Sequence, residues 1–412
     1  MRVLLFNFKM NKSKIELELK NGSDVSIINL VDNLIEYAHT VRASDIHLDP
    51  NETGMRVRLR IDGVLDDVFI FPKAIRSEVI SRIKVMAGMR TDEHQTAQDG
   101  RFRSIFEDIG PVDIRVSIAP TYFGENAVLR LLSDKSAEFT IDSLGFSDTD
   151  KEKINKAIRR SHGMILSTGP TGSGKTTTLY TLLKILNKPE VSIITIEDPI
   201  EYAVEDLNQI QVNPRTGLSF SNGLRSILRQ DPDIIMVGEI RDPETASIAV
   251  NTSLTGHLLL STLHTNDAAT TLPRMLDMGI EPYLIASTVN IVIGQRLVRK
   301  LCPHCKVKKA LTGNEQKSLK SILAGDSSEV KNFYHGKGCE KCNKTGYRGR
   351  LGIYEVMLVD SAIRESFLRK ASASEIKAIA QANGMVTMSE DGLKKAQKGL
   401  TTIEEVLRVI NE

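Results

Sequence analysis

The sequence has no tryptophan, few aromatic residues and no long hydrophobic run. Aromatic residues account for 5% of its 412 residues. The longest weakly polar run, residues 283–294, is well short of the ~20 residues that a helix needs to cross a bilayer. The apolar stretch at residues 3–6 is too short for the core of a signal peptide. These absences predict a cytoplasmic protein whose contact with a membrane is indirect.

The chain also lacks a strong excess of charge of either sign. It has 54 lysine and arginine residues against 52 acidic residues, and its formal net charge is +2. This balance provides no global attraction to nucleic acid or to an anionic membrane surface, so we expect no direct nucleic-acid partner. The 41% hydrophobic content is enough for ordinary cores, and the length predicts about two or three domains.

Only four cysteines are present, and they occur as two Cys-x-x-Cys pairs. In a reducing compartment two such pairs can offer four thiolates to one tetrahedral Zn²⁺, whereas a disulfide framework is typical of short secreted chains. Redox thiols and plain buried cysteines are the alternatives. The gap between the pairs is longer than in a short zinc ribbon and predicts an inserted loop or helix. The predicted zinc ligands are Cys302, Cys305, Cys339 and Cys342.

The segment GPTGSGKT, residues 169–176, has the pattern of a loop that binds nucleotide phosphates. Its glycines let the backbone turn so that successive N–H groups can point at a polyphosphate. Lys175 adds a mobile positive charge near the β- and γ-phosphates, and the hydroxyl of Thr176 can ligate Mg²⁺. The predicted nucleotide-binding residues are Gly169, Pro170, Thr171, Gly172, Ser173, Gly174, Lys175, Thr176 and Thr177.

This interpretation requires a strand before the loop and a helix after it, and the sequence predicts both. The uncharged run at residues 164–168 is typical of a buried strand, and residues 177–187 carry apolar residues at helical spacing. The helix then directs the positive end of its dipole at the phosphates. The alternative, a glycine-rich turn with a chance lysine, does not account for these surroundings. The sequence therefore predicts a protein that binds ATP or GTP.

Strand and helix patterns alternate after the loop, which predicts a mostly parallel sheet with crossover helices. The fold class is therefore α/β, with a RecA-like P-loop NTPase domain preceded by a small α/β domain and followed by a tetracysteine zinc region and a helical tail. The first residues are expected to form a short strand or part of a linker. The expected segments are an N-terminal extension (1–24), the small α/β domain of PAS-like type (25–132), a linker (133–149), the ATPase domain (150–300), the zinc-binding region (301–355) and a C-terminal helical subdomain (356–412).

Glu197 and His264 directly follow predicted strands of the ATPase domain, and Glu239 follows another after Gly238. The carboxyl ends of these strands lie beside the phosphate loop, where a group that orients or deprotonates water is needed. Gly238 stands where many such proteins place the aspartate directed at Mg²⁺, so Glu239 is expected to take the metal-side or water-side role. The alternatives are that Glu197 caps the next element, that Glu239 pairs with Arg241, and that His264 is an ordinary surface residue.

The first domain is rich in arginine. Such residues usually form a solvated face, but a nucleotide held between two domains or subunits calls for arginine fingers that stabilise the charge on its phosphates. The sequence does not choose among the arginines of this domain. The candidates are Arg101, Arg115 and Arg130.

Four stretches together resemble the bacterial type II secretion and type IV pilus assembly ATPases, of the general secretion pathway protein E type. They are GPTGSGKT, TIEDPIEY at 195–202, RQDPDIIMVGEIRDPETA at 229–246 and TGHLLLSTLHTNDA at 255–268. The match extends upstream through ASDIHLDP and LRIDGVL, and downstream through QRLVRKLCPHC and GYRGRLGIYE. It covers essentially the whole chain from about residue 25 onward.

The resemblance implies residue roles by position. Lys175 and Thr176 are then the phosphate and Mg²⁺ ligands of the Walker A motif. Glu197 and Glu239 are the catalytic carboxylates, and His264 belongs to the His box. The family's first-domain arginines align with Arg101, Arg115 and Arg130.

The resemblance also implies a cytoplasmic homo-hexameric ring at the inner face of the inner membrane, where ATP hydrolysis drives assembly of a type IV pilus or a type II secretion pseudopilus. Its partner is then an inner-membrane platform protein. Assembly members commonly carry the tetracysteine region and retraction members lack it, which favours an assembly motor. Many assembly members have a further N-terminal domain that docks on a membrane partner, and this chain starts almost directly at the second domain.

Two other functions remain open at the level of sequence. One is a retraction or DNA-uptake ATPase of the same superfamily, which the cysteine pairs disfavour. The other is a nucleotide-gated module that binds nucleic acid through the zinc region, supported only by the lysines beside the first cysteine pair. There is no aromatic platform there for stacking bases. These lysines are Lys300, Lys306, Lys308 and Lys309.

Overall fold

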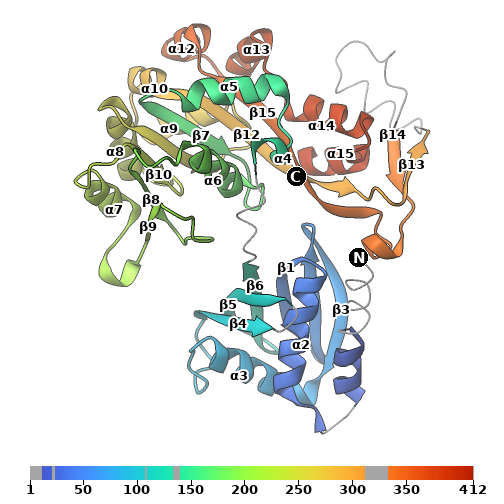
Figure 1. Cartoon of the computed structure of the whole chain (residues 1–412). Coiled ribbons are helices and arrows are strands. Elements are labelled where there is room, and N and C mark those ends of the chain that lie inside the picture. Colours follow the sequence, from blue (N-terminus) through green and yellow to red (C-terminus); the bar gives the residue numbers. More distant parts are fainter. Residues whose placement is uncertain (1–11, 21–23, 107–108, 133–139, 311–332, 412) are drawn as a thin grey trace. The chain divides into compact units, whose positions relative to one another are not determined.

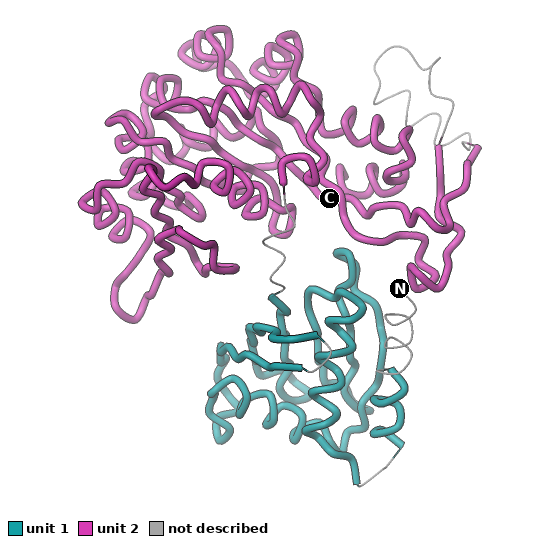
Figure 2. Tube along the Cα trace, viewed as in Figure 1, with its two compact units in different colours: residues 1–134 teal, residues 135–412 magenta. Residues whose placement is uncertain are grey.

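The computed structural model describes residues 12–20, 24–106, 109–132, 140–310 and 333–411. The chain divides into two compact units, Met1–Asp134 and Lys135–Glu412 (Figure 2). The boundary falls inside the expected linker, residues 133–149. All of that segment's described part, residues 140–149, belongs to the second unit and contains α4 (Ile141–Leu144) and the start of α5 (Asp148–Ile158).

The first unit is a six-stranded antiparallel sheet in the order β3-β2-β1-β6-β5-β4, with helices packed on it. Apolar residues at every second position of β5 are buried, as expected for a sheet with one covered face. The elements are α2 (Ile27–Thr40), β1 (Ala43–Pro50), β2 (Gly54–Ile61), β3 (Val64–Pro72), α3 (Arg76–Met86), β4 (Gln98–Phe106), β5 (Gly110–Thr121) and β6 (Gly124–Leu132).

The expectation that the N-terminal extension forms a strand or linker is wrong. Residues 12–20 are helical, not a strand or linker, and Ile15 is fully buried in the core of the first unit. The side chain of Glu18 accepts a hydrogen bond from the backbone N–H of Ser26, which itself caps α2. The short alternating pattern was compatible with a strand, but the tertiary contact of Ile15 favours the helix. Residues 1–11 and 21–23 lie outside the described residues.

The second unit contains a seven-stranded sheet in the order β15-β12-β7-β11-β10-β8-β9. All neighbouring pairs are parallel except β12 and β15. The predicted strands of the ATPase domain correspond to β7, β8, β10 and β11, so the α/β fold class is confirmed. The strands are β7 (Gly163–Thr168), β8 (Ile193–Glu197), β9 (Asn208–Gln211), β10 (Ile234–Val237), β11 (Leu258–Leu263), β12 (Val289–Leu301) and β15 (Tyr347–Leu358).

Helices cover both faces of this sheet, and two hydrophobic cores lie between the layers (Figure 1). Every residue of β7 and β11 is buried, which is the burial expected of central parallel strands. No helix among the described residues combines the length and the apolar character needed to span a bilayer. Besides α4 and α5, the helices are α6 (Lys175–Leu186), α7 (Phe220–Ile227), α8 (Pro243–Leu254), α9 (Thr271–Asp277), α10 (Pro282–Thr288), α12 (Ser361–Leu368), α13 (Ala373–Ala382), α14 (Met388–Gln397) and α15 (Ile403–Asn411).

The cysteine-rich region is joined directly to the main sheet. β12 and β15 form a long antiparallel pair at the edge of the sheet, and this pair crosses the expected boundary between the ATPase domain and the zinc-binding region. The cysteine pairs lie beyond its far end, next to the small sheet of β13 (Lys306–Lys309) and β14 (Phe333–Gly336). The expected insertion between the cysteine pairs falls largely on residues 311–332, outside the described residues.

Candidate functional site

The phosphate loop connects the end of β7 to the start of α6 (Figure 1). Gly169, Gly172 and Gly174 all have positive φ angles, which a residue with a Cβ rarely adopts. A Cβ at Gly169 would lie 2.4 Å from the carbonyl oxygen of Gln295, so this glycine is also required by packing. Because Gly174 is the N-cap of α6, the loop runs into a helix N-terminus that favours an anion.

Gln295 on β12 braces this loop. Its side-chain nitrogen donates to the carbonyl oxygen of Ser173 at 2.9 Å, and its side-chain oxygen accepts from the Ser167 hydroxyl at 3.2 Å. Gln295 is 1% exposed, so both contacts lie in a buried environment where an unmade hydrogen bond is costly. No pattern in the sequence predicted this role. The only signal was that Gln295 begins the QRLVRKLCPHC stretch of the resemblance.

Lys175 is buried, and its Nζ donates to the carbonyl oxygens of Gly169 at 2.9 Å and Pro170 at 3.0 Å. Burial lowers the pKa of Lys175 to about 8, while the charge of Glu239 acts in the opposite direction. A lysine in such a position is a mobile cation held close to the phosphate loop by neutral carbonyl groups. Its ammonium group can move to a bound polyphosphate without first breaking an ion pair.

Glu239 and His264 meet at the carboxyl edge of the sheet, beyond β10 and β11. His264 Nε2 lies 3.1 Å from Glu239 Oε2, and an Arg241 guanidinium nitrogen lies 2.5 Å from Glu239 Oε1. The Glu239 side chain is 10% exposed, whereas the side chains of His264 and Arg241 are 45% and 64% exposed. Glu239 therefore makes the alternative pair with Arg241 and also contacts His264, which the sequence placed at the same edge of the sheet. The result is a buried carboxylate between two exposed cationic or proton-carrying groups.

The structure explains why a glycine precedes Glu239. The N–H of Gly238 donates to the carbonyl of Ile196 on β8, and its own carbonyl accepts from the hydroxyl of Thr262 on β11. A Cβ at Gly238 would lie 3.3 Å from backbone atoms of both Ile196 and Glu197. The backbone is thus held between two neighbouring strands with little room for an aspartate, and the acidic side chain comes one residue later.

The end of β7 is also hydrogen-bonded to the segment that carries His264. The Thr168 hydroxyl lies within hydrogen-bond distance of the carbonyls of Leu263 and Thr265, and the Thr265 N–H donates back to it at 3.0 Å. These hydrogen bonds position the histidine segment relative to the phosphate loop, since β7 and β11 are neighbouring parallel strands. Neither threonine was predicted from the sequence to have this role.

Glu197 lies in a different environment from Glu239. It is 2% exposed, and its carboxylate accepts hydrogen bonds from Tyr180, Thr195 at 2.6 Å and Gln209 at 3.2 Å. Burial raises the pKa of Glu197, although these three donors lower it. Within the described residues, no hydrogen bond or ion pair joins Glu197 to Lys175. A carboxyl group with a raised pKa is suited to exchanging a proton, but both of its oxygens already have partners.

The candidate arginines of the first unit form a row across its sheet. Arg101 on β4 is opposite Arg115 on β5, which is opposite Arg130 on β6. The row continues to Asp45 on β1 and Arg60 on β2. Arg130 Nε lies 3.0 Å from one oxygen of Asp45, and Arg60 Nε lies 3.6 Å from the other. Asp45 therefore offsets the positive charge of Arg130 and Arg60 at one end of the row. Arg101 and Arg115 form the other, more basic end.

The four cysteines converge, as their pairing predicted. Their sulfur atoms lie within 4.8 Å of one another, with Sγ–Sγ distances of 3.8 Å for two cross-pair contacts and 3.7 Å within the second pair. A regular tetrahedron with metal–sulfur bonds of about 2.3 Å has edges of about 3.8 Å, so the cluster has the dimensions of a tetrathiolate zinc site. The cluster consists of Cys302, Cys305, Cys339 and Cys342.

The backbone around the cluster also suits thiolate ligands. The N–H groups of Cys339 and Gly346 donate to the sulfur of Cys342 at 3.2 and 3.3 Å. Burial opposes ionisation of Cys342, but these donors lower the pKa of its thiol to about 7. His304, beside the first cysteine pair, makes a contact with Lys341 at 3.3 Å.

The comparisons with known proteins agree with this geometry. A family model described as "Type II/IV secretion system protein" matches residues 20–408. The chain is 45% identical over 399 residues to the type IV pilus assembly ATPase PilB of Myxococcus xanthus, covering 97% of this chain and 70% of that protein. It is 46% identical over 396 residues to the type II secretion system protein E of Dickeya dadantii, covering 96% of this chain and 78% of that protein.

Two solved structures have the same fold. The pilus retraction motor PilT, solved with bound ADP, has a TM-score of 0.61 and 27% identity, covering 91% of this chain and 95% of that one. The ATPase DotB of Legionella pneumophila has a TM-score of 0.67 at 21% identity, covering 92% and 95%, and supports the fold alone. With its phosphate loop, acidic strand end and matching relatives, the chain belongs to the Type II/IV secretion system protein family and is an ATP hydrolase of that family.

Proposed function

We propose that this ATPase drives the assembly of a type IV pilus or a type II secretion pseudopilus. The observation that carries the proposal is the tetracysteine cluster, which lies at the end of the β12–β15 pair at the edge of the ATPase sheet. It occurs in a chain 45–46% identical to proteins named for pilus assembly and type II secretion, and 27% identical to one named for retraction. The cluster was also the feature that favoured assembly over retraction at the level of sequence.

The proposed catalytic cycle uses the groups at the carboxyl edge. Lys175 leaves the loop carbonyls and contacts the β- and γ-phosphates of ATP. Glu239 accepts the proton of the attacking water or holds it in line, and His264 orients Glu239 from the exposed side. Mg²⁺ would be held by Thr176 and Glu239, and when bound it neutralises charge developing on the phosphates. Glu197 is the second proposed catalytic carboxylate.

The arginine row of the first unit supplies the proposed arginine fingers. Charges in a row of arginines repel, and an anion with several negative oxygens relieves that repulsion. Because Asp45 already pairs with Arg130, Arg101 and Arg115 are the better candidates for contact with a triphosphate. In the proposed homo-hexamer this triphosphate is the one held by another domain or subunit. Closure of the row over ATP would couple hydrolysis to domain movement.

We also propose that the cysteine cluster holds a structural Zn²⁺. Replacing Cys339 with serine is expected to reduce the zinc content from about one atom per chain to near none, because three thiolates and an alcohol do not form a closed site. Metal analysis of the purified protein measures this directly. His304→Ala is the matched control, since His304 lies beside the cluster and contacts Lys341 instead. Zinc retained in full by Cys339→Ser, or absent from the unaltered protein, would remove the metal from the proposal.

The assembly role is tested at the membrane. We expect the tagged protein, captured from the membrane fraction in ATP and Mg²⁺, to carry with it the inner-membrane platform protein of a pilus or secretion system. An untagged strain is the control for non-specific capture. Loss of surface pili or of secreted protein in a strain whose chain carries Lys175→Ala is the second readout. A captured partner from neither system, together with normal pili and secretion, would contradict the proposal.

A further inference from the structure

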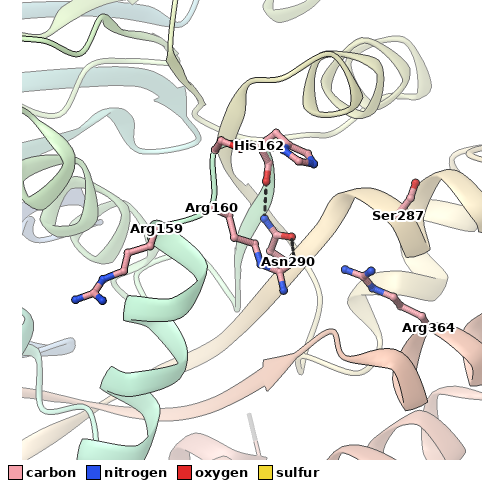
Figure 3. A pocket seen from close by; sticks show the side chains of 7 residues that line it. Arg159, Arg160, His162, Ser287, Asn290 and Arg364 are labelled. Atoms are coloured by element: carbon pink, nitrogen blue, oxygen red, sulfur yellow. Dashed lines mark hydrogen bonds between the residues drawn. The ribbon is translucent and has the colours of Figure 1, made fainter.

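A second basic site lies on the ATPase unit, away from the phosphate loop. It is a cavity of about 470 Å³, formed by the end of α5, the residues leading into β7, the end of α10, the start of β12 and α12. We call it the amino-edge pocket. Its lining includes Arg159, Arg160, His162, Ser287, Asn290 and Arg364 (Figure 3).

The position of the pocket separates it from the ATP site. β7 and β12 are parallel, and the pocket lies where both strands begin, whereas the phosphate loop follows the last residue of β7. A strand of six residues spans roughly 20 Å, so one bound molecule of ordinary size cannot occupy both places. Nothing in the proposed hydrolysis cycle uses the residues of this pocket.

A buried polar group forms the floor of the pocket. Asn290 is 2% exposed, and its amide nitrogen donates to the carbonyl of His162 at 2.9 Å while its amide oxygen accepts from Arg160 at 2.6 Å. A Cβ at Gly163 would lie 2.3 Å from the Asn290 amide nitrogen, so the glycine makes room for this arrangement. Asn290 therefore holds the guanidinium of Arg160 in a defined place (Figure 3).

Arg364 approaches from another element, and its guanidinium is directed toward Arg160 and Asn290 (Figure 3). Its Nε is buried and has no hydrogen-bond partner among the described residues. Burial and the charge of Arg160 both lower the pKa of Arg364, against the effect of Asp360. Asp360 itself caps α12 and accepts from Asn383, so it does not fill the pocket. The two guanidinium groups thus repel each other at this cavity, and the buried Nε of Arg364 is left without a partner beside it.

Helix dipoles do not account for this set of charges. Arg159 and Arg160 follow the C-terminus of α5, where positive charge is favourable. Arg364, by contrast, lies at the fourth position of α12, near an N-terminus that disfavours a cation. None of the residues lining the pocket is acidic. An external anion is the group that would compensate Arg160 and Arg364, whereas the Arg159 side chain points away from them (Figure 3).

We propose that the amino-edge pocket binds a phosphate group, with Arg160 and Arg364 as its two principal ligands. A phosphate has several acceptor oxygens for the planar fork of each guanidinium, and its charge offsets their repulsion. The cavity volume lies in the range of sites for small molecules. The phosphate has two sources, a soluble phosphorylated compound or the headgroup of an anionic lipid. His162 and Ser287 lie at the rim, where either source presents its remaining polar atoms.

The test uses the whole protein with its ATP site filled by a non-hydrolysable ATP analogue and Mg²⁺. Inorganic pyrophosphate is then titrated by calorimetry, and in parallel the protein is floated with vesicles of phosphatidylglycerol in phosphatidylcholine or of phosphatidylcholine alone. We expect a remaining binding event that is weakened about tenfold or more in Arg364→Gln, which removes a charged hydrogen-bond donor. Arg369→Gln, an exposed change at the other end of α12, is the matched control and keeps the affinity.

Each outcome is informative. Arg364→Gln leaves the Asn290 contacts intact, so loss of binding with an unchanged melting curve is attributed to the pocket and not to unfolding. Binding of pyrophosphate without flotation indicates a soluble ligand, and flotation that requires phosphatidylglycerol and Arg364 indicates a lipid headgroup. The proposal is overturned if neither probe binds once the ATP site is filled, or if Arg364→Gln and the double variant with Arg160→Gln bind as well as the unaltered protein.

Discussion

Replacing Glu239 with glutamine is expected to lower kcat for ATP by about a hundredfold or more while ATP still binds. Glutamine keeps the size of the side chain but cannot accept a proton or offer a negative charge to a metal. It also loses the ion pair with Arg241 and changes the contact with His264. Steady-state phosphate release measures the loss, and equilibrium binding of a fluorescent ATP analogue shows that the site remains formed.

The control for this variant is Glu244→Gln. Glu244 lies in the first turn of α8, a few residues along the chain, and pairs with Arg225 on the exposed surface. It should retain normal turnover. If Glu239→Gln hydrolysed ATP at the unaltered rate, Glu239 would have no catalytic role, and Glu197 would be the remaining carboxylate candidate.

The second large effect is expected for Lys175→Ala, which should weaken ATP binding by about a hundredfold and abolish measurable turnover. The reason is that the alanine cannot place a cation against the β- and γ-phosphates. Lys184→Ala, in the last turn of the same helix, is the matched control because it lies at the opposite end from the phosphate loop. ATP binding of normal affinity by Lys175→Ala would show that the loop does not hold the triphosphate.

The lowered pKa of Lys175 predicts how ATP binding depends on pH. Since burial lowers the pKa of Lys175 to about 8, the free protein carries the ammonium below that pH and loses it as the pH rises. A bound phosphate favours the ammonium, so ATP affinity should fall above pH 8, by at most about tenfold for each pH unit. Proton uptake on binding, measured by calorimetry in buffers of different ionisation enthalpy, should appear in that range. Lys175→Arg stays charged, and uptake that persisted in it would assign the effect to another group.

Much of the candidate site could be predicted from the sequence because its signals are local. The phosphate loop needs glycines at fixed spacing between a buried strand and a helix, and all of these belong to one continuous segment. Glu239 and His264 could be placed for a related reason, because the ends of parallel strands share one edge of a sheet. The cysteine pairs are likewise recognisable as local turns, although the fold had to bring them together.

The environment of each group could not be predicted in this way. Glu197 and Glu239 follow similar strands, yet one is enclosed by three donors and the other lies beside exposed Arg241 and His264. The difference arises because Tyr180 and Gln209 come from a helix and an edge strand that reach only Glu197. Side-chain contacts of this kind depend on packing between elements, which no short pattern encodes.

The sequence by itself determined that this chain binds a nucleoside triphosphate, that its candidate catalytic carboxylates follow parallel strands, and that its cysteines form one cluster. Only the tertiary structure decided that Gln295 braces the phosphate loop, that the arginines of the first unit form one row, and that Arg160 and Arg364 face a common cavity. The physical reason is the range of the interactions. Loop conformation and strand ends follow from neighbouring residues, whereas these three arrangements require strands and helices far apart in sequence to pack side by side.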